Sequence, residues 1–370
     1  MLRPRVLFLL AIGLLLAVHP MLAANYAVGT CKPSLPSYTT ISAAVSGVPP
    51  GSTVLVCPGT YPEQVTIAQP LTLKGISSGN AGQAVITVPG SGLTAITSGD
   101  GYPIAPMVDV TAGPVNISDI TVDGSGNNIT YPPWVVGILY DSGSSGTVNE
   151  ITARNLNTSG AGAGVGVWAD NVSATNESVT ITNSSFHNID NTSVATDGST
   201  LLATVKGNTM QAGFFQVQWF SSGSLTANVI NGGYEAVSVS GPVTVSGNTM
   251  ANQSYGIVAS GGVTATSNKI SNASGAGIYD NGGGNTYKAN TITKVGVGIE
   301  FNCHTPTVAS NTINDATTGL NNVPASFSGA NSFYNVVTLR TDGCGSAPIH
   351  GPNSPAAPSS GSGPRPAPAH

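Results

Sequence analysis

The sequence predicts a β-solenoid, an all-β fold in which short strands form stacked coils. Its first sign is an asparagine followed two places later by an apolar residue, recurring at steps of 20, 20, 20, 22, 21 and 20 residues. This period is too short for a pair of helices, and the surrounding residues alternate as in short strands, so each repeat is one coil. The repeated asparagines are Asn208, Asn228, Asn248, Asn268, Asn290, Asn311 and Asn331.

A second repeat runs in phase with the first and consists of a small or polar residue followed by an apolar one. Each coil therefore carries at least two strands, whose alternate side chains point into the solenoid. We expect the asparagine amides to stack and hydrogen-bond from coil to coil, a structural role. The apolar residues expected to point inward are Ile138, Val167, Val194, Val217, Val237, Ile257, Ile278 and Ile299, with Val194 placed although its coil lacks the glycine.

Composition supports this fold and excludes some partners. Of 370 residues only 7% are charged, and Gly, Ser, Thr, Asn and Val dominate, as expected for many short strands joined by tight turns. The net charge is −5 with only 11 Lys plus Arg. Because no basic stripe could neutralise phosphates, we expect no nucleic-acid or anionic-membrane partner. Separately, we expect the protein to be a monomer.

The two ends of the chain differ from the repeats. Arg3 and Arg5 precede an apolar run over 6–18, and the small residues Ala23 and Ala24 follow, a pattern typical of a secretory signal peptide. The run is too short to favour a membrane span, although a retained anchor is the alternative. We therefore predict a signal peptide over 1–24, one β-helix domain over 25–344 and a disordered Pro/Ser/Gly-rich tail over 345–370. The protein would be secreted, periplasmic or at the cell surface, with no membrane insertion after signal removal.

Four cysteines fit an oxidising compartment. Cys31 and Cys57 lie 26 residues apart near the start of the domain, and Cys303 and Cys344 lie 41 apart near its end. Neither pair has the spacing of a metal or redox motif. We predict that each pair forms a disulfide at one end of the solenoid, where the last coils lack a neighbour.

The opening of the domain carries a resemblance to a known superfamily. Residues 38–48 read as a short capping helix, and 52–75 as a strand, a turn and two more strands. The runs over 40–45, 49–56, 58–67 and 71–75 resemble the opening of right-handed parallel β-helix proteins of the pectin-lyase-like superfamily. The superfamily includes many exported carbohydrate-active proteins and many uncharacterised bacterial ones. The repeats extend the resemblance to about residue 340, so it implies this fold for most of the mature chain.

The same resemblance implies little about chemistry. Polysaccharide lyases of this fold use a Lys or Arg base beside calcium-binding carboxylates, but no Lys or Arg lies between Arg154 and Lys206 or between Lys206 and Lys269. The paired aspartates of polygalacturonase-like hydrolases are absent. Pectin methylesterases share the Gly-x-Tyr-x-Glu pattern of 59–63, but their catalytic aspartate segments have no counterpart here. We expect the 59–63 turn to shape the first coil.

The alternation of side chains predicts a functional face. Three places after the inward residues, Asp141, Asp170 and Asp197 take equivalent positions on successive coils. Stacked carboxylates repel unless a cation or a shared proton intervenes, so these aspartates are candidate calcium ligands and candidate catalytic groups. The alternative is that they end strands and bond to turn amides. No cofactor other than calcium is indicated.

Other residues on this face have the chemistry of sugar binding, since aromatic rings stack on sugars and polar groups hydrogen-bond to them. Coils here are also longer, with 28 residues from Asn155 to Asn183 and 25 from Asn183 to Asn208, so loops should project beside the face. The candidate substrate-binding residues are Trp168, Gln218, Phe220, Tyr279 and Glu300.

The sequence thus favours an exported β-helix protein that binds extracellular or cell-surface polysaccharide. A calcium-assisted polysaccharide lyase or a glycoside hydrolase is the first alternative. A surface structural or adhesin-like module is the second.

Overall fold

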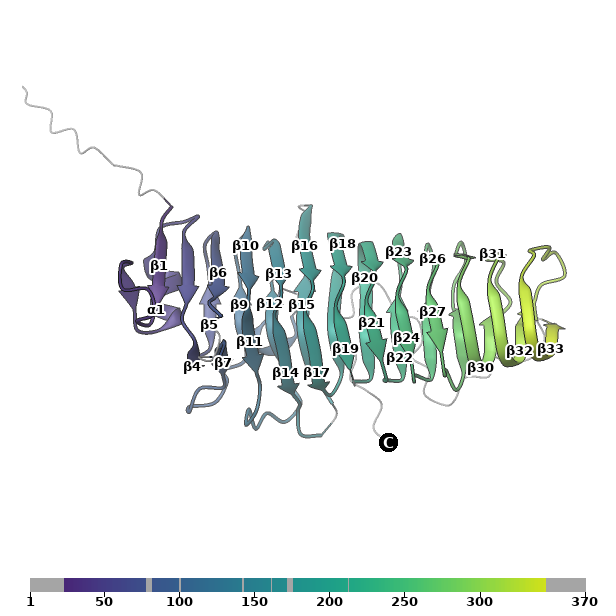
Figure 1. Ribbon diagram of the computed structural model, residues 1–370, viewed down its shortest axis with the longest axis horizontal. Helices are drawn as coiled ribbons and strands as arrows, with labels where there is room; N and C mark the ends of the chain where they lie inside the picture. Colours follow the sequence, from purple (N-terminus) through teal and green to yellow (C-terminus); the bar gives the residue numbers. More distant parts are fainter. Residues whose placement is uncertain are drawn as a thin grey trace, which may run out of the picture.

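The computed structural model describes residues 23–77, 82–99, 101–141, 143–160, 162–171, 176–211 and 213–343. These residues form one elongated solenoid that runs from β1 (Asn25–Val28) to β33 (Ser332–Asp342), with coil stacked on coil (Figure 1). Among the described strands, every pairing is parallel except that of β8 (Ile96–Thr97) with β9 (Pro103–Val110). The predicted parallel β-solenoid is confirmed.

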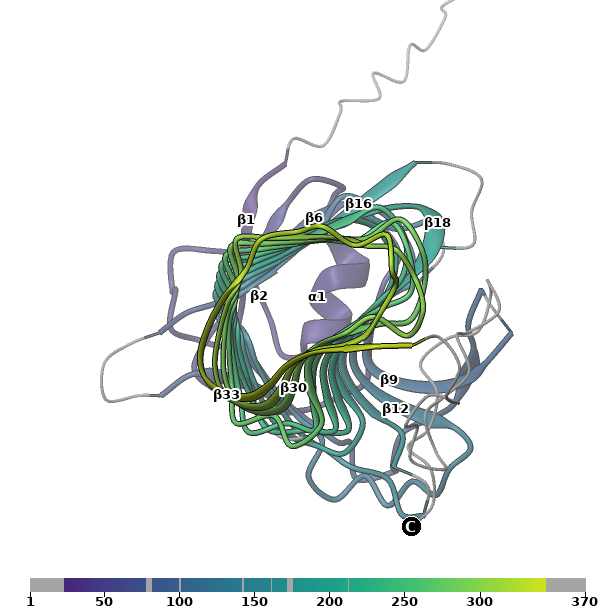
Figure 2. The same ribbon diagram turned by 90° about the vertical axis from the view of Figure 1, so that its right-hand side faces the viewer.

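Successive pairings define three faces, here called sheets A, B and C, which enclose one core (Figure 2). Sheet A contains β1, β3 (Thr53–Val56), β6 (Leu71–Gly75), β10 (Val115–Ser118), β13 (Gly146–Asn149), β16 (Glu177–Thr182), β23 (Val243–Ser246), β26 (Thr264–Thr266), β29 (Thr286–Lys288) and β31 (Thr307–Ala309). Sheet B contains β4 (Gly59–Pro62), β7 (Ala84–Thr87), β11 (Ile120–Asp123), β14 (Thr152–Leu156), β17 (Ser185–Ile189), β19 (Thr209–Gln211), β21 (Val229–Asn231), β24 (Thr249–Ala251) and β27 (Lys269–Ser271). Sheet C contains β5 (Val65–Ile67), β9, β12 (Trp134–Tyr140), β15 (Gly164–Asp170), β22 (Glu235–Val239), β25 (Tyr255–Ala259) and β28 (Ala276–Asp280).

Five long strands turn the corner between two faces. β18 (Thr192–Lys206) and β20 (Phe215–Thr226) run from sheet C into sheet A. β30 (Thr291–Glu300), β32 (Thr312–Val323) and β33 run from sheet B into sheet C. Each coil therefore carries three strand segments. The two sequence repeats had predicted at least two.

The first coil is closed by a short helix, α1 (Ile41–Gly47), which lies within the predicted 38–48 (Figure 2). Thr40 caps it by accepting from the backbone N–H of Ala43. The Glu63 carboxylate accepts from the backbone N–H groups of Ile41 and Ser42, both at 2.9 Å, so it satisfies the start of the helix. The 59–63 turn thus shapes the first coil, as expected from the sequence. The other short element, β2 (Ser37–Tyr38), pairs with β1.

The core is a ladder of aliphatic side chains. The predicted inward residues pair coil to coil in one register, including Val194 between Val167 and Val217. All of them are fully buried. Burying a Val or Ile side chain contributes roughly 1.5–3 kcal/mol, so each added coil extends the core by similar increments.

The asparagine repeat forms a buried hydrogen-bonded ladder at the turn between sheets A and B. Asn248 is representative: its Oδ1 accepts from the backbone N–H and the Nδ2 of Asn228, both at 2.9 Å. Its Nδ2 donates to Leu225 O at 2.9 Å and to the Oδ1 of Asn268 at 3.0 Å. The same pattern runs from Asn208 to Asn331. The structural role predicted for these residues is confirmed.

The predicted disulfide between Cys31 and Cys57 is present. Cys303 is described, but Cys344 lies outside the described residues, so the second pairing stays a prediction. The predicted tail and nearly all of the predicted signal peptide also lie outside them. Within the part of the chain that the structure describes, no helix is long and apolar enough to cross a membrane.

Replacing one ladder asparagine should destabilise the solenoid strongly. Asn248→Ala would leave the buried Asn228 N–H without its acceptor and would remove the amide that donates to Leu225 O, at a cost of roughly 3 kcal/mol. Urea unfolding monitored by circular dichroism measures the loss. The control is Asn231→Ala: Asn231 accepts from Asn252 at the exposed surface and should cost under about 1 kcal/mol. Equal effects of the two substitutions would contradict the role assigned to the ladder.

Candidate functional site

The outer face of sheet C carries two columns of outward side chains. One column follows the inward ladder by one residue, as predicted, and the pairings place Trp168, Gln218, Tyr279 and Glu300 in it. The second column precedes the ladder by two residues and was not anticipated. It contains Val136, Val165, Thr192, Phe215, Glu235 and Tyr255.

Carboxylates gather on the first coils of this face. Asp170 and Asp197 are register partners on adjacent coils, and both are buried. Asp141 follows β12, and its Oδ1 accepts from Gly99 N at 3.0 Å. Burial, followed by the nearby charge of Asp141, raises the pKa of Asp109 to about 6. The predicted aspartates thus share a face with a fourth carboxylate, Asp109, which the sequence pattern did not single out.

The three predicted aspartates are not gathered around a common point. Among the described residues, no group of three or more His, Cys, Asp or Glu side chains could hold a metal ion. Register alignment alone does not converge their oxygens, because each carboxylate projects from its own coil. Calcium binding by this column therefore stays a prediction, which a calcium titration of the melting temperature would test.

Trp168 is fully buried in a hydrophobic cluster outside the main core. Its ring lies 6.1 Å from that of Trp134 and 6.3 Å from that of Tyr102, centroid to centroid. Residues beside β8 and β9 cover it, since Ile96 and Tyr102 pack on the same cluster. In this structure the Trp168 ring therefore presents no free face to a sugar. The loop that covers it could not be foreseen from the local alternation of side chains.

Further along the face, aromatic rings follow one another from coil to coil. Phe214 stacks on Tyr234 with centroids 4.9 Å apart, Tyr234 meets Tyr255 at 5.5 Å, and Tyr255 meets Tyr279 at 5.8 Å. We call these four residues the aromatic strip. Its first three members are partly exposed, whereas Tyr279 is buried. Of the four, the sequence singled out Tyr279 alone.

Two buried polar side chains lie beside the aromatic strip. Gln218 and Glu235 are each only 3% exposed, and Gln218 Oε1 and Glu235 Oε2 have no hydrogen-bond partner. Burial raises the pKa of Glu235 to about 7, although a hydrogen bond with Ser238 partly opposes this rise. Glu235 is therefore about half protonated near pH 7, and in its protonated form the carboxyl group can donate as well as accept. Counting two residues back from Val237 would have found Glu235 in the sequence.

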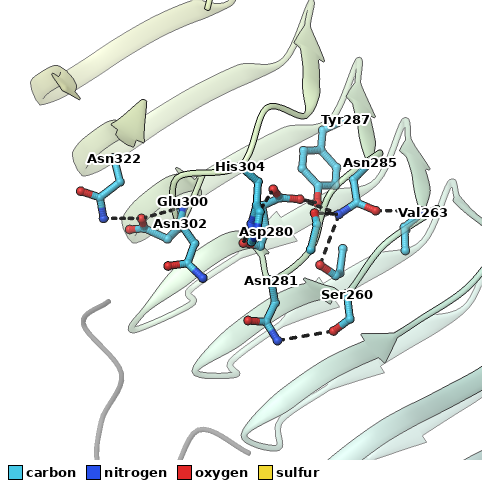
Figure 3. A network of polar contacts seen from close by, with 12 residues as sticks. Ser260, Val263, Asp280, Asn281, Asn285, Tyr287, Glu300, Asn302, His304 and Asn322 are labelled. Carbon is cyan, nitrogen blue, oxygen red and sulfur yellow. Dashed lines mark hydrogen bonds and ion pairs between the residues drawn. The ribbon is translucent and has the colours of Figure 1, made fainter. Parts of the chain in front are cut away.

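A polar network closes the far end of the face (Figure 3). Glu300 accepts from the side-chain amides of Asn321 at 2.6 Å and Asn322 at 2.8 Å, on the next coil. Asp280 occupies an inward position, where it accepts from Tyr287 Oη and from Asn285 Nδ2 at 2.6 Å.

The other oxygen of Asp280 lies 3.5 Å from His304 Nδ1. Burial raises the pKa of Asp280 to about 6, while its hydrogen bonds and His304 oppose this rise. The asparagine amides therefore hold Glu300 at the end of the outward column, while Asp280 is held by its own separate set of donors.

The predicted site residues thus share one face but divide into groups. The aspartates and Trp168 lie on the early coils, with Trp168 covered. Phe220 is the partner of Asp197 on the next coil and is partly exposed. Gln218, Tyr279 and Glu300 lie on the later coils, beside the aromatic strip.

Comparison with known proteins identifies the fold. No family model and no curated protein sequence matches this chain. The catalytic domain of a GH87 α-1,3-glucanase, solved in complex with tetrasaccharides, is 13% identical with a TM-score of 0.57, covering 87% of this chain and 66% of that one. A GH136 lacto-N-biosidase from Eubacterium ramulus is 10% identical with a TM-score of 0.58, covering 85% and 68%.

A third similar structure is the tailspike protein of E. coli bacteriophage HK620 in complex with a hexasaccharide. It is 11% identical with a TM-score of 0.50, and the match covers 86% of this chain and 67% of that one. The chain thus spans about two thirds of the length of each of these proteins. At such low identity the likeness concerns architecture alone: the chain has a parallel β-helix fold.

Replacing Glu235 by Gln should stabilise the protein in a pH-dependent way. The carboxyl pKa rises from 4.5 to about 7 on folding, which corresponds to about 3 kcal/mol. Below pH 4.5 both states are protonated and there is no penalty. The free-energy cost of burying the ionised Glu235 grows between these two pKa values and is constant above the higher one. Glu235→Gln removes this cost, so it should raise the melting temperature at pH 8 but hardly at pH 4.

Thermal melts across this pH range provide the measurement. Asp315→Asn on β32 is the control: Asp315 is partly exposed, so the substitution should show no comparable trend. A Glu235→Gln effect that does not vary with pH would contradict the raised pKa.

Proposed function

We propose that this chain is an exported protein that binds a polysaccharide along the outer face of sheet C. The aromatic strip is the observation that carries the proposal, because it places rings in contact on four successive coils, and three of these rings are partly exposed. Aromatic faces stack on the apolar faces of sugar rings, and neighbouring polar groups fix their orientation. Gln218, Glu235 and Glu300 supply such groups on the same face.

The shape of the fold supports an extended ligand. Coils lie about 4.8 Å apart, so equivalent side chains repeat along the axis and match a chain of repeated units. Two of the similar structures were solved with oligosaccharides bound, as their descriptions state. That fact supports a carbohydrate ligand for this chain as part of the proposal.

Export is the second part of the proposal. The Cys31–Cys57 disulfide is expected of a protein that folds in an oxidising compartment. Cleavage near Ala24, the tail after residue 344 and a monomeric state remain predictions from the sequence. The right-handed winding is also proposed, supported by the strong preference of parallel strand crossovers for that hand.

A glycoside hydrolase is the second candidate, favoured by one specific observation. Asp170 and Asp197 lie on adjacent coils, about 4.8 Å apart along the axis, which is compatible with the carboxyl separations of glycosidases. A lyase is less well supported, because no lysine or arginine occupies the two outward columns of sheet C within the described residues. A structural or adhesin-like role would not require the buried, unpaired polar atoms of Gln218 and Glu235.

Removing a ring from the aromatic strip should weaken polysaccharide binding. Tyr255 lies between Tyr234 and Tyr279, so Tyr255→Ala removes the central contact and should raise Kd about tenfold or more. Affinity electrophoresis against soluble polysaccharides, followed by calorimetry, gives the measurement. Tyr334→Ala is the matched control, since Tyr334 lies on β33 and is 61% exposed. The proposed surface would be wrong if both variants bound as the parent does, or if both lost binding equally.

The hydrolase candidate predicts a different pattern. If Asp170 and Asp197 act on a glycosidic bond, Asp170→Asn or Asp197→Asn should lower the release of reducing ends at least about 100-fold and change binding little. The control is again Asp315→Asn. Failure of the parent protein to release reducing ends from any bound polysaccharide would eliminate this candidate and leave the binding function intact.

A further inference from the structure

The charges of the chain are distributed unevenly around the solenoid. Sheet C and the residues directly after its strands carry outward acidic groups along the proposed binding face. These acids are Asp109, Asp141, Asp170, Asp197, Glu235 and Glu300. Asp109, Asp170, Asp197, Glu235 and Glu300 are less than 10% exposed, so solvent screens their charges poorly.

Most basic residues of the described part of the chain lie elsewhere. Lys74, Lys206 and Lys288 lie on sheet A, and Arg154 and Lys269 on sheet B. Lys32 lies before the first coil of sheet B, and Lys294 lies in the turn between sheets B and C. Arg340 is the exception: it lies on the sheet C part of β33 as the register partner of Leu320, and it ion-pairs with Asp342. Within the described residues, no lysine or arginine occupies the two outward columns of sheet C that carry Glu235 and Glu300.

The buried polar groups on this face do not need a charged ligand. Gln218 Oε1 and Glu235 Oε2 are acceptors without partners, and a sugar hydroxyl can donate to each of them. Leaving such buried acceptors unpaired costs about 1–3 kcal/mol each, so a ligand that pairs them gains affinity. These two atoms indicate a ligand rich in uncharged donors.

We propose that the polysaccharide bound by this face is electrically neutral and that the face rejects polyuronates. This inference rests on the proposed binding function and specifies its substrate class. Hydroxyl groups donate to the face's carboxylates, whereas a uronate carboxylate can only accept at neutral pH. Placing a uronate among buried carboxylates brings like charges together in a region of reduced dielectric, which disfavours the wrong ligand.

Protonation of acidic groups on this face should weaken its rejection of polyuronates. Glu235, with a pKa of about 7, and Asp109, with a pKa of about 6, lose their negative charge as the pH falls. Polyuronates remain charged at pH 5.5, because isolated carboxyl groups titrate well below that value. The face should therefore discriminate most sharply near pH 8 and less at pH 5.5.

The test compares two classes of soluble probe with the mature, disulfide-bonded protein. Neutral glucans, mannans and galactans form one class, and polygalacturonate and alginate form the other. We expect at least one neutral polysaccharide to bind with a Kd at least tenfold below that of either polyuronate at pH 8. Binding of the neutral ligand should be unchanged between 0.1 and 0.5 M NaCl, because no ion pairs form. At pH 5.5 the ratio should fall.

A variant tests the cause of the discrimination. Glu235→Gln removes an ionisable group at nearly constant shape and should strengthen polyuronate binding at pH 8 about threefold or more, relative to the neutral ligand. Glu300→Gln is a second variant on the same face. Asp315→Asn removes a carboxylate from β32, away from the outward columns of sheet C, and should leave the ratio unchanged. Circular dichroism confirms that each variant is folded before its binding is compared.

Each outcome decides a different statement. Polyuronate binding equal to or tighter than neutral binding, with or without calcium, would overturn the neutral-ligand inference and leave the binding function standing. Absence of binding to either class would overturn the proposed function itself. A ratio that shifts equally for Glu235→Gln and Asp315→Asn would show that net charge, and not this face, sets the preference.

Discussion

Everything in this molecule depends on in-register parallel pairing of one coil with the next. Because a coil can bury its apolar residues only if its neighbour presents the same register, each position along the coil becomes a column along the axis. The aliphatic ladder around Val194 and Val217 is one such column, and the asparagine ladder is another. At the turn between sheets A and B, buried backbone groups would otherwise lack hydrogen-bond partners, and the asparagine side chains supply those partners.

The same rule acts on the outer faces, where it has chemical consequences. A column of carboxylates brings like charges together, which costs free energy unless protons, donors or ligands compensate. The structure shows several forms of compensation: Asp141 accepts from a loop amide, Glu300 from asparagine amides, and the pKa values of Asp109 and Glu235 rise. Such compensation is needed where burial prevents water from stabilising the charge. The face is therefore built at some cost to stability, which is common for binding surfaces.

Asp280 shows how far the fold tolerates a polar residue in its interior. It takes an inward position, next to the ladder residue Ile278, and is fully buried. Asn285 and Tyr287 lie just after it, across the turn from sheet C to sheet A in the same coil, and their donors replace those of water. A position that alternation marks as apolar can thus hold an acid when the facing residues are polar.

Local spacing by itself determined the architecture of this protein. The 20-residue step and strand alternation predicted the coil, the inward ladder and the role of the asparagines, because a column follows directly from a repeated position. The pairing of Cys31 with Cys57 was also predictable, since both lie at one end of a linear fold. The face that carries Gln218, Tyr279 and Glu300 followed from the same alternation. Only the tertiary structure decided which of its residues a ligand could reach.

Trp168 is covered because residues around Ile96 and Tyr102 return over its coil, and no local pattern encodes the path of such a loop. Glu235 and Tyr255 were missed because strict alternation places the residue two before each inward ladder residue inside the solenoid. Here the small or polar residue between them breaks the alternation, and the residue two before the ladder points outward. Burial and proton affinity depend on what covers a side chain in space, and that is decided by contacts between segments far apart in the chain.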